Sequence, residues 1–233
     1  MKPTETYMRE LRAWLAETES TPLEEMDAFF TRRLSGYEAH MLAHWAADYE
    51  NLAAAVPADA KRILDLGCGT GLELDAVFRR FPQMRVTGVD LSPAMLERLR
   101  EKHGGRALEL ICGSYFTVDF PGPFDAAISF ESLHHFTAAE KLPLFRKIFE
   151  ALAPGGVFLN GDYFACCPEE EALLRGTLER RRAAEGIPPE RFIHFDTPLT
   201  VEHETQALRA AGFSEVFVTA QTDGATVLCA KKA

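Results

Sequence analysis

A short apolar segment that runs into three closely spaced glycines constrains the fold of this chain more than any other feature. Residues 63–66 have the character of a buried strand, Gly67, Gly69 and Gly71 follow, and residues 72–81 have the apolar spacing of an amphipathic helix. Glycine permits positive φ and lets the backbone approach a ligand closely. Open α/β sheets bind their ligands at the carboxyl ends of the strands. The segment therefore predicts an α/β fold with a ligand at this loop.

The pattern of strand and helix then repeats along the chain. Further strands are expected at residues 85–89, 107–112, 124–130 and 157–163. Helices are expected at residues 93–103, where Ser92 is the N-cap, and at residues 138–152, which end before Pro154-Gly155-Gly156. Because strands that alternate with helices form parallel sheets, we expect a doubly wound parallel sheet.

The end of the sequence departs from this alternation. A helix over residues 201–211 stops at Gly212, and two strands follow at residues 213–220 and 225–230. The segment between them, Gln221-Thr222-Asp223-Gly224, is compatible with a hairpin turn. The sheet is therefore expected to end in an antiparallel pair.

Two helical regions stand outside the sheet. Helices are expected at residues 6–16, 23–34 and 37–56, with a break at Ser35-Gly36. A charged helix over residues 169–185 interrupts the α/β alternation. We therefore expect an N-terminal helical cap at residues 1–60 and a ligand-binding domain at residues 61–233, with an inserted helical lid at residues 164–196.

Composition and charge narrow the range of partners. The 233 residues carry a formal net charge of −10, which disfavours binding to nucleic acid through phosphate contacts. The chain starts without the apolar region of a signal peptide, and no apolar stretch approaches the ~18 residues of a membrane span. The 5 cysteines lack the spacing of a zinc or redox motif. We expect a cytoplasmic protein with free thiols and no membrane partner.

An acidic residue follows the glycine loop at the next strand. Asp90 ends the second predicted strand, where its carboxylate can accept both hydroxyls of an adenosine ribose. The glycines are spaced GxGxG, and Leu72 stands where the dinucleotide fingerprint GxGxxG has its third glycine. The loop is therefore not expected to hold a dinucleotide pyrophosphate.

These motifs together resemble the class I S-adenosylmethionine-dependent methyltransferases. Asp65 with the GxGxG loop, Asp90, Leu152-Ala153-Pro154-Gly155-Gly156 and Ala210-Ala211-Gly212-Phe213 stand in the order found in that family. The resemblance implies a Rossmann-like sheet of seven strands whose last strand is antiparallel, and S-adenosylmethionine as cofactor. The cofactor-binding positions that it implies are Asp65, Gly67, Cys68, Gly69, Gly71, Asp90, Leu91, Gly113, Ser114, Tyr115, Phe130 and, from a covering helix, Tyr37.

One position departs from the family pattern. After the third strand the family often has an acid that accepts from the adenine amino group, but here the pair is Gly113-Ser114. A serine hydroxyl still accepts a hydrogen bond, and Tyr115 and Phe116 could add stacking.

The segment after the fourth strand supplies the candidates for catalysis. Methyl transfer is an in-line displacement that needs a base only where the acceptor has a proton to lose. His135, His134 and Glu131 are the candidates for that base, although His135 could instead buttress the strand. His40 and His44 lack the glutamate of an HExxH metal site, so no metal is expected.

The sequence thus predicts a methyltransferase that acts on a small molecule and yields S-adenosylhomocysteine. Two alternatives stay open. One is a non-catalytic or regulatory protein that binds S-adenosylmethionine, suggested by Ser114, and the other, disfavoured by the charge, is an RNA or protein methyltransferase. Apolar positions on the N-terminal helices could serve a homodimer as well as a lid.

Overall fold

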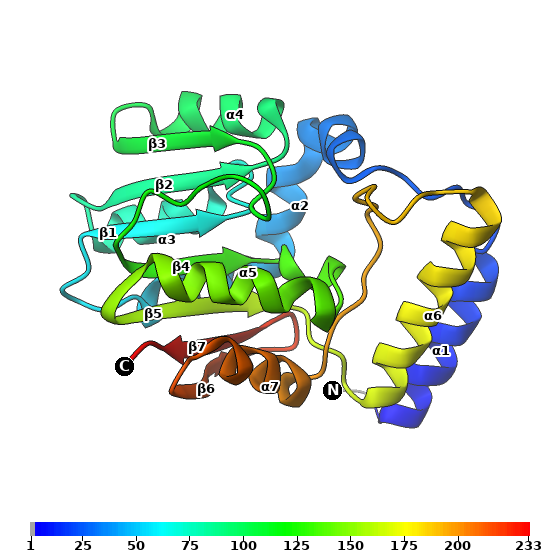
Figure 1. Cartoon of the computed structure of the whole chain (residues 1–233). Coiled ribbons are helices and arrows are strands. Elements are labelled where there is room, and N and C mark those ends of the chain that lie inside the picture. The colour runs from blue at the N-terminus through cyan, green and yellow to red at the C-terminus, as the bar shows by residue number, and fades with distance from the viewer. Residues whose placement is uncertain (1–2) are drawn as a thin grey trace.

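The computed structural model describes residues 3–233 and is built around one mixed sheet. The strand order is β3-β2-β1-β4-β5-β7-β6, and β7 is antiparallel to both of its neighbours (Figure 1). The predicted sheet with an antiparallel last strand is confirmed. The strands are β1 Arg62–Leu66, β2 Arg85–Asp90, β3 Ala107–Cys112, β4 Phe124–Phe130, β5 Leu152–Asp162, β6 Glu215–Gln221 and β7 Thr226–Lys231.

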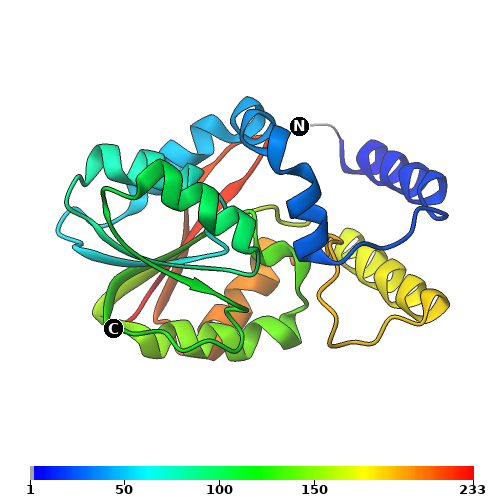
Figure 2. The same cartoon turned by 90° about the horizontal axis from the view of Figure 1, so that it is seen from above.

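Helices cover both faces of the sheet, as Figure 2 shows from above. On one face α2 (Met26–Ala55), α3 (Leu72–Arg80) and α4 (Pro93–His103) enclose one apolar core. On the other face α5 (Ala138–Ala151) and α7 (Val201–Ala211) enclose a second. Burial of apolar side chains on both faces explains why the strands read as continuous apolar runs.

The parallel register places the carboxyl ends of the central strands at one edge. Asp65 of β1 pairs with Gly88 of β2 and Ile128 of β4, and β4 in turn pairs with β5 in parallel. The segments that follow these strands therefore meet there. Gly67, Asp90, Glu131 and Asp162 lie at or just beyond the strand ends, although they are far apart in sequence.

Two expected breaks are absent. The chain does not break at Ser35-Gly36, because α2 runs through it, and the only non-helical residue inside α2 is Trp45 (φ −122°, ψ 15°). Glycine costs a helix only about 1 kcal/mol, which the apolar burial along α2 outweighs. Nor does a separate turn divide α5 from β5. The strand begins at Leu152, and its register shifts past Gly155 (φ +77°), so the expected turn is a bulge within β5.

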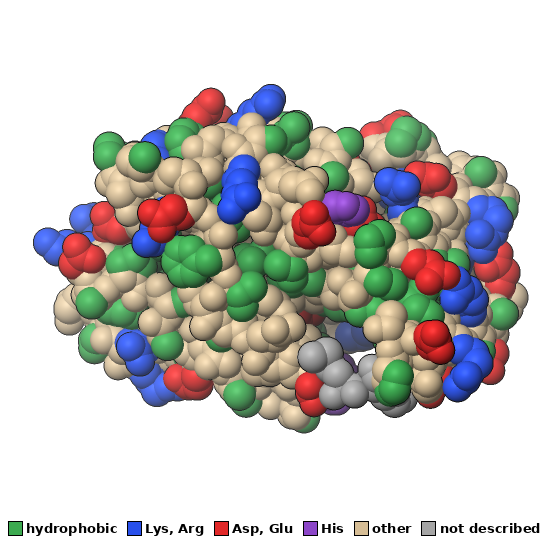
Figure 3. Space-filling model, turned by 90° about the horizontal axis from the view of Figure 1, so that it is seen from below, with side chains coloured by type: hydrophobic (Ala, Val, Ile, Leu, Met, Phe, Trp, Pro, Cys, Tyr) green, Lys and Arg blue, Asp and Glu red, His purple; other side chains and the backbone are tan. Residues whose placement is uncertain are grey.

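A third apolar cluster lies away from the sheet. Helix α1 (Thr4–Glu17) packs along α6 (Pro168–Glu185), with Leu15 buried beside Leu174 and Leu178 (Figures 1 and 2). The outer surface of this helix pair carries interleaved acidic and basic side chains (Figure 3). We call the pair the lid. Residues 1–60 are thus shared between the lid and the sheet domain, since α2 packs on the sheet.

None of the helices in residues 3–233 is long and apolar enough to cross a membrane.

Candidate active site

Backbone hydrogen bonds hold the glycine loop after β1 against the end of β2. Gly67, Gly69 and Gly71 all have positive φ. The amides of Gly67 and Cys68 donate to the Val89 carbonyl at 2.8 and 3.2 Å. A Cβ on Gly67 would lie 2.2 Å from the Ser132 Oγ, so a glycine is required there. The loop and the segment after β4 therefore touch, and they form the floor of one pocket.

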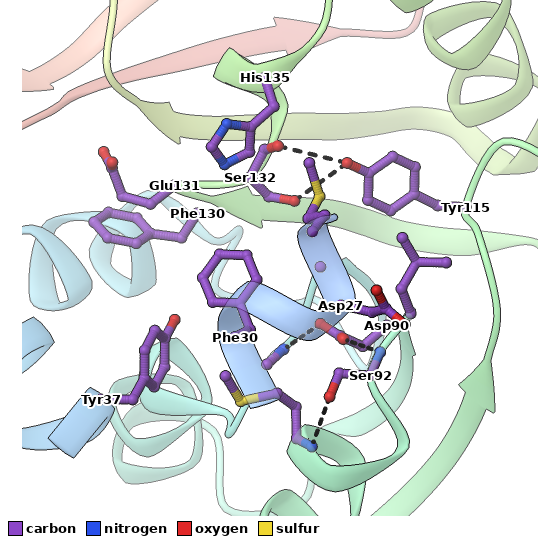
Figure 4. Close-up of a pocket in the computed structure, with 15 residues that line it drawn as sticks. Asp27, Phe30, Tyr37, Asp90, Ser92, Tyr115, Phe130, Glu131, Ser132 and His135 are labelled. Carbon is purple, nitrogen blue, oxygen red and sulfur yellow. Dashed lines mark hydrogen bonds between the residues drawn. The ribbon is translucent and has the colours of Figure 1, made fainter. Parts of the chain in front are cut away.

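Asp90 holds this loop and keeps capacity for a ligand. Its Oδ2 accepts from the Gly69 amide at 2.9 Å, and its Oδ1 accepts from the Ser92 amide at 2.8 Å (Figure 4). Burial raises the pKa of Asp90, while these two amide donors oppose the rise. Each carboxylate oxygen can accept a second hydrogen bond. Asp90 can therefore receive two further donors, such as the hydroxyls of a ribose.

The pocket above the loop, which we call the glycine-loop pocket, brings together many of the predicted residues (Figure 4). It is lined by the predicted Tyr37, Gly67, Gly69, Asp90, Leu91, Tyr115, Phe130, Glu131 and His135. Met26, Asp27, Phe30, Ser92, Met95 and Ser132 complete the wall. The first three come from the start of α2, a segment with no motif in the sequence to signal that position.

Other predicted residues lie outside this pocket. The Cys68 side chain points into the core, where its Sγ lies 2.8 Å from the place of a Cβ on Gly88. Gly71 is the N-cap of α3. Gly113 donates its amide to the Asp90 carbonyl, and the Ser114 Oγ accepts from the Phe116 amide at 3.3 Å. Gly71, Gly113 and Ser114 therefore shape the loops around the pocket, and the expected adenine contact of Ser114 stays a prediction.

Asp65 lies behind the loop with a second acid that the sequence did not single out. Burial raises the pKa of Asp65 well above its usual value, and burial raises that of Glu73 to about 7. A side-chain hydrogen bond between Asp65 and Glu73 acts on the pKa of both, so the pair of carboxyl groups shares a proton. Asp65 does not line the glycine-loop pocket, and its expected contact with the cofactor stays a prediction.

A larger cavity of about 930 Å³ adjoins the glycine-loop pocket. We call it the histidine cavity, because His40, His134, His135 and His194 line it. Its remaining wall combines aromatic side chains, namely Phe29, Phe30, Tyr37, Trp45 and Tyr163, with charged ones, namely Arg33, Glu131, Asp196 and Asp223. Phe30, Tyr37, Glu131 and His135 belong to both spaces, so the two adjoin. A cavity of this size can hold a small organic molecule.

His134 is bridged between two carboxylates. Its Nδ1 lies 2.6 Å from the Asp162 Oδ1, and its Nε2 lies 3.4 Å from the Asp196 Oδ1. Burial by itself lowers the pKa of His134, but the two carboxylates outweigh burial and hold that pKa well above its usual value. His134 is therefore a cation at neutral pH, and both of its N–H groups are used. It cannot accept a proton from an acceptor.

His135 has the opposite protonation state. Its Nδ1 lies 3.3 Å from the Phe195 carbonyl and 3.3 Å from the Asp196 carboxylate. Burial and the charge of His134 lower the pKa of His135, so the ring is neutral at pH 7. An Nδ1–H that donates to these oxygens leaves Nε2 as the basic nitrogen. Of the three candidates for a base, His135 is thus the one whose protonation state suits the task.

Glu131 differs from both histidines. It has a left-handed backbone conformation, with φ 47°. Burial raises the pKa of Glu131 to about 8, and its Oε1 is buried without a hydrogen-bond partner. The nearest basic nitrogen in an ion pair with it is the Nδ1 of His134, at 3.9 Å.

These side chains have the spacing of a metal site without requiring one. Among the described residues, the ligand atoms of Glu131, His134 and Asp162 lie within 4.8 Å of one another, and so do those of His134, His135 and Asp196. Both ring nitrogens of His134 carry a proton that is hydrogen bonded to Asp162 or Asp196, so the short distances in these groups need no metal ion to explain them. His40 and His44 belong to neither group. The expectation of no metal stays a prediction.

Comparison with known proteins gives one family. Residues 63–156 match the family described as "Methyltransferase domain". The chain is 32% identical to the trans-aconitate 2-methyltransferase of Streptomyces coelicolor over 72% of this chain and 57% of that protein. The alignments span 41%, 57% and 66% of the first three curated relatives, so the chain covers about half of their length.

Solved structures agree on the fold. An O-methyltransferase family protein from Burkholderia thailandensis has a TM-score of 0.67 and 21% identity, over 89% of this chain and 61% of that one. Human N-acetylserotonin methyltransferase, solved in complex with SAM, has a TM-score of 0.62 and 18% identity, over 81% of this chain and 52% of that one.

Proposed function

Because the chain carries the domain of the class I S-adenosylmethionine-dependent methyltransferases, we propose that it transfers the methyl group of S-adenosylmethionine to a small-molecule acceptor. The product of the cofactor is S-adenosylhomocysteine. One observation carries the proposal: a pocket built on Asp90 and the glycine loop opens beside a cavity that holds a neutral histidine. The cofactor and the acceptor would thus have separate sites that share a wall.

The cofactor is proposed to lie along the glycine-loop pocket. Asp90 receives the ribose hydroxyls on the lone pairs that Gly69 and Ser92 leave free. The backbone at Gly67 and Gly69 lies against the methionine part, while Leu91 and Met95 are placed for the adenine ring. The reactive methyl group then faces the wall shared with the histidine cavity. These placements rest on the pocket lining and on the resemblance of the motifs.

We propose His135 as the general base for a hydroxyl acceptor. Its ring lines both spaces, and the Nδ1 contacts with Phe195 and Asp196 fix its orientation. The Nε2 atom takes the proton while the acceptor oxygen attacks the methyl group and the sulfur takes the electron pair of the broken bond. His134 is then a positioning residue, because its positive charge keeps its neighbour His135 neutral.

The names of two relatives support an acceptor of low molecular weight, and one of these names specifies oxygen. One is named a fatty-acid O-methyltransferase and another a trans-aconitate 2-methyltransferase. Net charge of −10 supports a small molecule over nucleic acid as the partner. We further propose a cytoplasmic location and a covering role for residues 164–196. In place of the expected boundary at residue 60, we propose that α2 belongs with the sheet domain, because it packs on the sheet. Trp14 and Leu42 are exposed, and they could serve a homodimer.

Ligand binding tests the cofactor before the acceptor is known. Calorimetry with S-adenosylmethionine, S-adenosylhomocysteine and NAD should show binding of the two adenosyl compounds and none of NAD. Binding of NAD alone, or of no ligand, would overturn the proposed function. Transfer of labelled methyl to a panel of hydroxylated small molecules then tests the reaction.

The variant His135→Asn separates catalysis from binding. We expect roughly 100-fold or more loss of methyl transfer with unchanged affinity for S-adenosylhomocysteine, because a general base contributes about 10²–10⁴ in rate. His44→Asn is the control, since His44 lies on the surface and outside both cavities. Full activity of His135→Asn together with a lower melting temperature would instead assign His135 a purely structural role.

A further inference from the structure

Glu131 lines both cavities, and one of its carboxyl oxygens lacks a hydrogen-bond partner. Its side chain is only 11% exposed, and its Oε1 is buried without a hydrogen-bond partner. A buried acceptor left unpaired costs about 1–3 kcal/mol. The mechanism proposed above gives Glu131 no part. Because the unpaired carboxyl group of Glu131 costs free energy and has no role in the protein alone, we look for a ligand that would hydrogen bond with it.

The backbone at Glu131 carries a further cost. Among residues 3–233 it is the non-glycine residue with positive φ, at 47°. Such a conformation costs about 1–3 kcal/mol and is concentrated at ligand-binding and catalytic sites. The Glu131 amide donates to the Gly161 carbonyl at 2.9 Å, which pins this conformation to the end of β5. The strained backbone therefore fixes where the carboxyl group lies.

Among residues 3–233, none donates a hydrogen bond to the Glu131 Oε1. The Nδ1 of His134 is 3.9 Å from the Glu131 Oε2, but it already bonds Asp162 at 2.6 Å. The other charged groups that act on Glu131 are carboxylates, those of Asp162, Asp196 and Asp48. Because Glu131 lines both cavities, a molecule bound there can supply the missing donor.

Glu131 lies near the proposed base. Both line the glycine-loop pocket and the histidine cavity, and both flank His134, whose ring centroid is 4.0 Å from that of His135. In the view of Figure 4 Glu131 and His135 lie in the upper part of the pocket, and Phe30 and Tyr37 lie below them. Phe30 and Trp45 give the histidine cavity apolar ring surfaces that suit a planar ring.

We propose that Glu131 selects the acceptor, by accepting a hydrogen bond from a second donor group next to the atom that is methylated. The acceptor is then a small aromatic molecule with two neighbouring donors, either two hydroxyl groups or one hydroxyl and one amino group. One donor faces His135 and becomes methylated, and the other faces Glu131 and stays unmodified. This inference rests on the proposed function, because it assumes the cofactor in the glycine-loop pocket.

Matched phenols test the inference on the full chain saturated with S-adenosylhomocysteine. Catechol and 2-aminophenol carry both donors, whereas 2-fluorophenol has nearly the same shape and lacks the second donor. We expect the wild-type chain to bind catechol and 2-aminophenol at least ten-fold more tightly than 2-fluorophenol, as measured by calorimetry. Glu131→Ala should remove this preference, and Glu131→Gln, which keeps one acceptor oxygen, should retain part of it.

The affinity for S-adenosylhomocysteine is the second readout. It should stay within two-fold in both variants, which also shows that they are folded. Equal binding of the matched phenols by the wild-type chain, or binding of none of them, would overturn the inference. So would a large loss of S-adenosylhomocysteine affinity in the variants, because the donor would then be the ammonium group of the cofactor. A wild-type chain that binds no S-adenosylhomocysteine would instead refute the proposed function itself.

Discussion

The glycine loop and the contact between lid and sheet are built in opposite ways. The loop is held by backbone amides of Gly67, Cys68 and Gly69, which donate to the end of β2. The lid is held by side chains. The buried carboxylate of Glu170 accepts from the hydroxyls of Tyr7 and Tyr163 and, at 2.6 Å, from the Cys166 amide.

The contrast indicates which region is rigid and which can open. The loop is continuous with the central strands, so it can open only when the sheet itself is disrupted. The lid has its own small apolar cluster and reaches the sheet through a few polar side chains. Regions with few buried contacts to the rest of a protein open at lower cost. We therefore expect the glycine loop to be preformed and the lid to move independently.

The largest loss of affinity for S-adenosylhomocysteine is expected when a single methyl group is added to the glycine loop. Gly67→Ala places a Cβ at 2.2 Å from the Ser132 Oγ on a backbone with φ +72°. Overpacking and the left-handed conformation together cost about 3 kcal/mol or more. Binding of S-adenosylhomocysteine should become unmeasurable by calorimetry. A variant that binds normally would show that the loop is as adaptable as the lid.

Asp90→Ala should have the next largest effect. It removes a carboxylate with two backbone donors and, in the proposed complex, two ribose hydroxyls. A hydrogen bond to a charged group contributes about 1.5–3 kcal/mol, so affinity for S-adenosylhomocysteine should fall roughly 100-fold. Asp119→Ala is the control, because Asp119 is an exposed carboxyl outside the pocket. Unchanged affinity of Asp90→Ala would remove it from the site.

Glu170→Gln tests whether the lid opens on its own. The amide keeps one acceptor oxygen but brings its own donors against three existing ones, at a cost of about 2 kcal/mol. Hydrogen exchange should accelerate in α1 and α6, while affinity for S-adenosylhomocysteine stays within two-fold. Glu169→Gln, on an exposed pair with Arg12, should change neither. Equal loss of protection in the sheet would contradict an independent lid.

The pH dependence of stability tests His134, at the junction of the two regions. Its pKa is raised in the folded state, so its contribution is fully present below about pH 6.5 and is lost as pH rises through the folded pKa. Over that interval the difference in unfolding free energy between wild type and His134→Gln should shrink by up to about 1.4 kcal/mol per pH unit. Denaturant titrations from pH 5 to 9 measure it. A constant difference would mean that His134 is neutral.

The smallest effect, a change in the stability of α6, is expected from substitution of a glycine in the lid. A Cβ on Gly176, inside α6, would meet nothing within 4 Å. Gly176→Ala should therefore stabilise α6 by about 0.5–1 kcal/mol, with the opposite sign to the loop glycine. Slower hydrogen exchange confined to the lid would confirm it. Destabilisation would show that α6 has a partner on that face.

The sheet was predictable because its signals are local. Each strand is a short apolar run that ends in a glycine, an acid or a turn, and each helix has an apolar stripe. The break expected at Ser35-Gly36 was wrong because a glycine penalty is small beside the burial of α2. The turn expected after α5 was partly wrong because β4 continues to pair with Leu152 before the bulge.

The site was only partly predictable. Gly67, Gly69, Asp90 and Leu91 line the pocket, as their positions at strand ends imply. Met26, Asp27 and Phe30 also line it, but no local pattern connects the start of α2 with the end of β2. The opposite charge states of His134 and His135 could not be predicted from the sequence either, since they depend on the carboxylates of Asp162, at the end of β5, and Asp196.

What the sequence by itself determined is the sheet, its strand ends and the backbone loop at Asp90, because these follow from apolar spacing and from glycine at fixed places in a strand. Only the tertiary structure decided which histidine is neutral, that Glu131 has an unpaired oxygen, and that α1 packs on α6. Those features depend on distances between residues far apart in the chain. The burial of a group and the charges around it depend on its neighbours in space, and a local sequence pattern does not predict those neighbours.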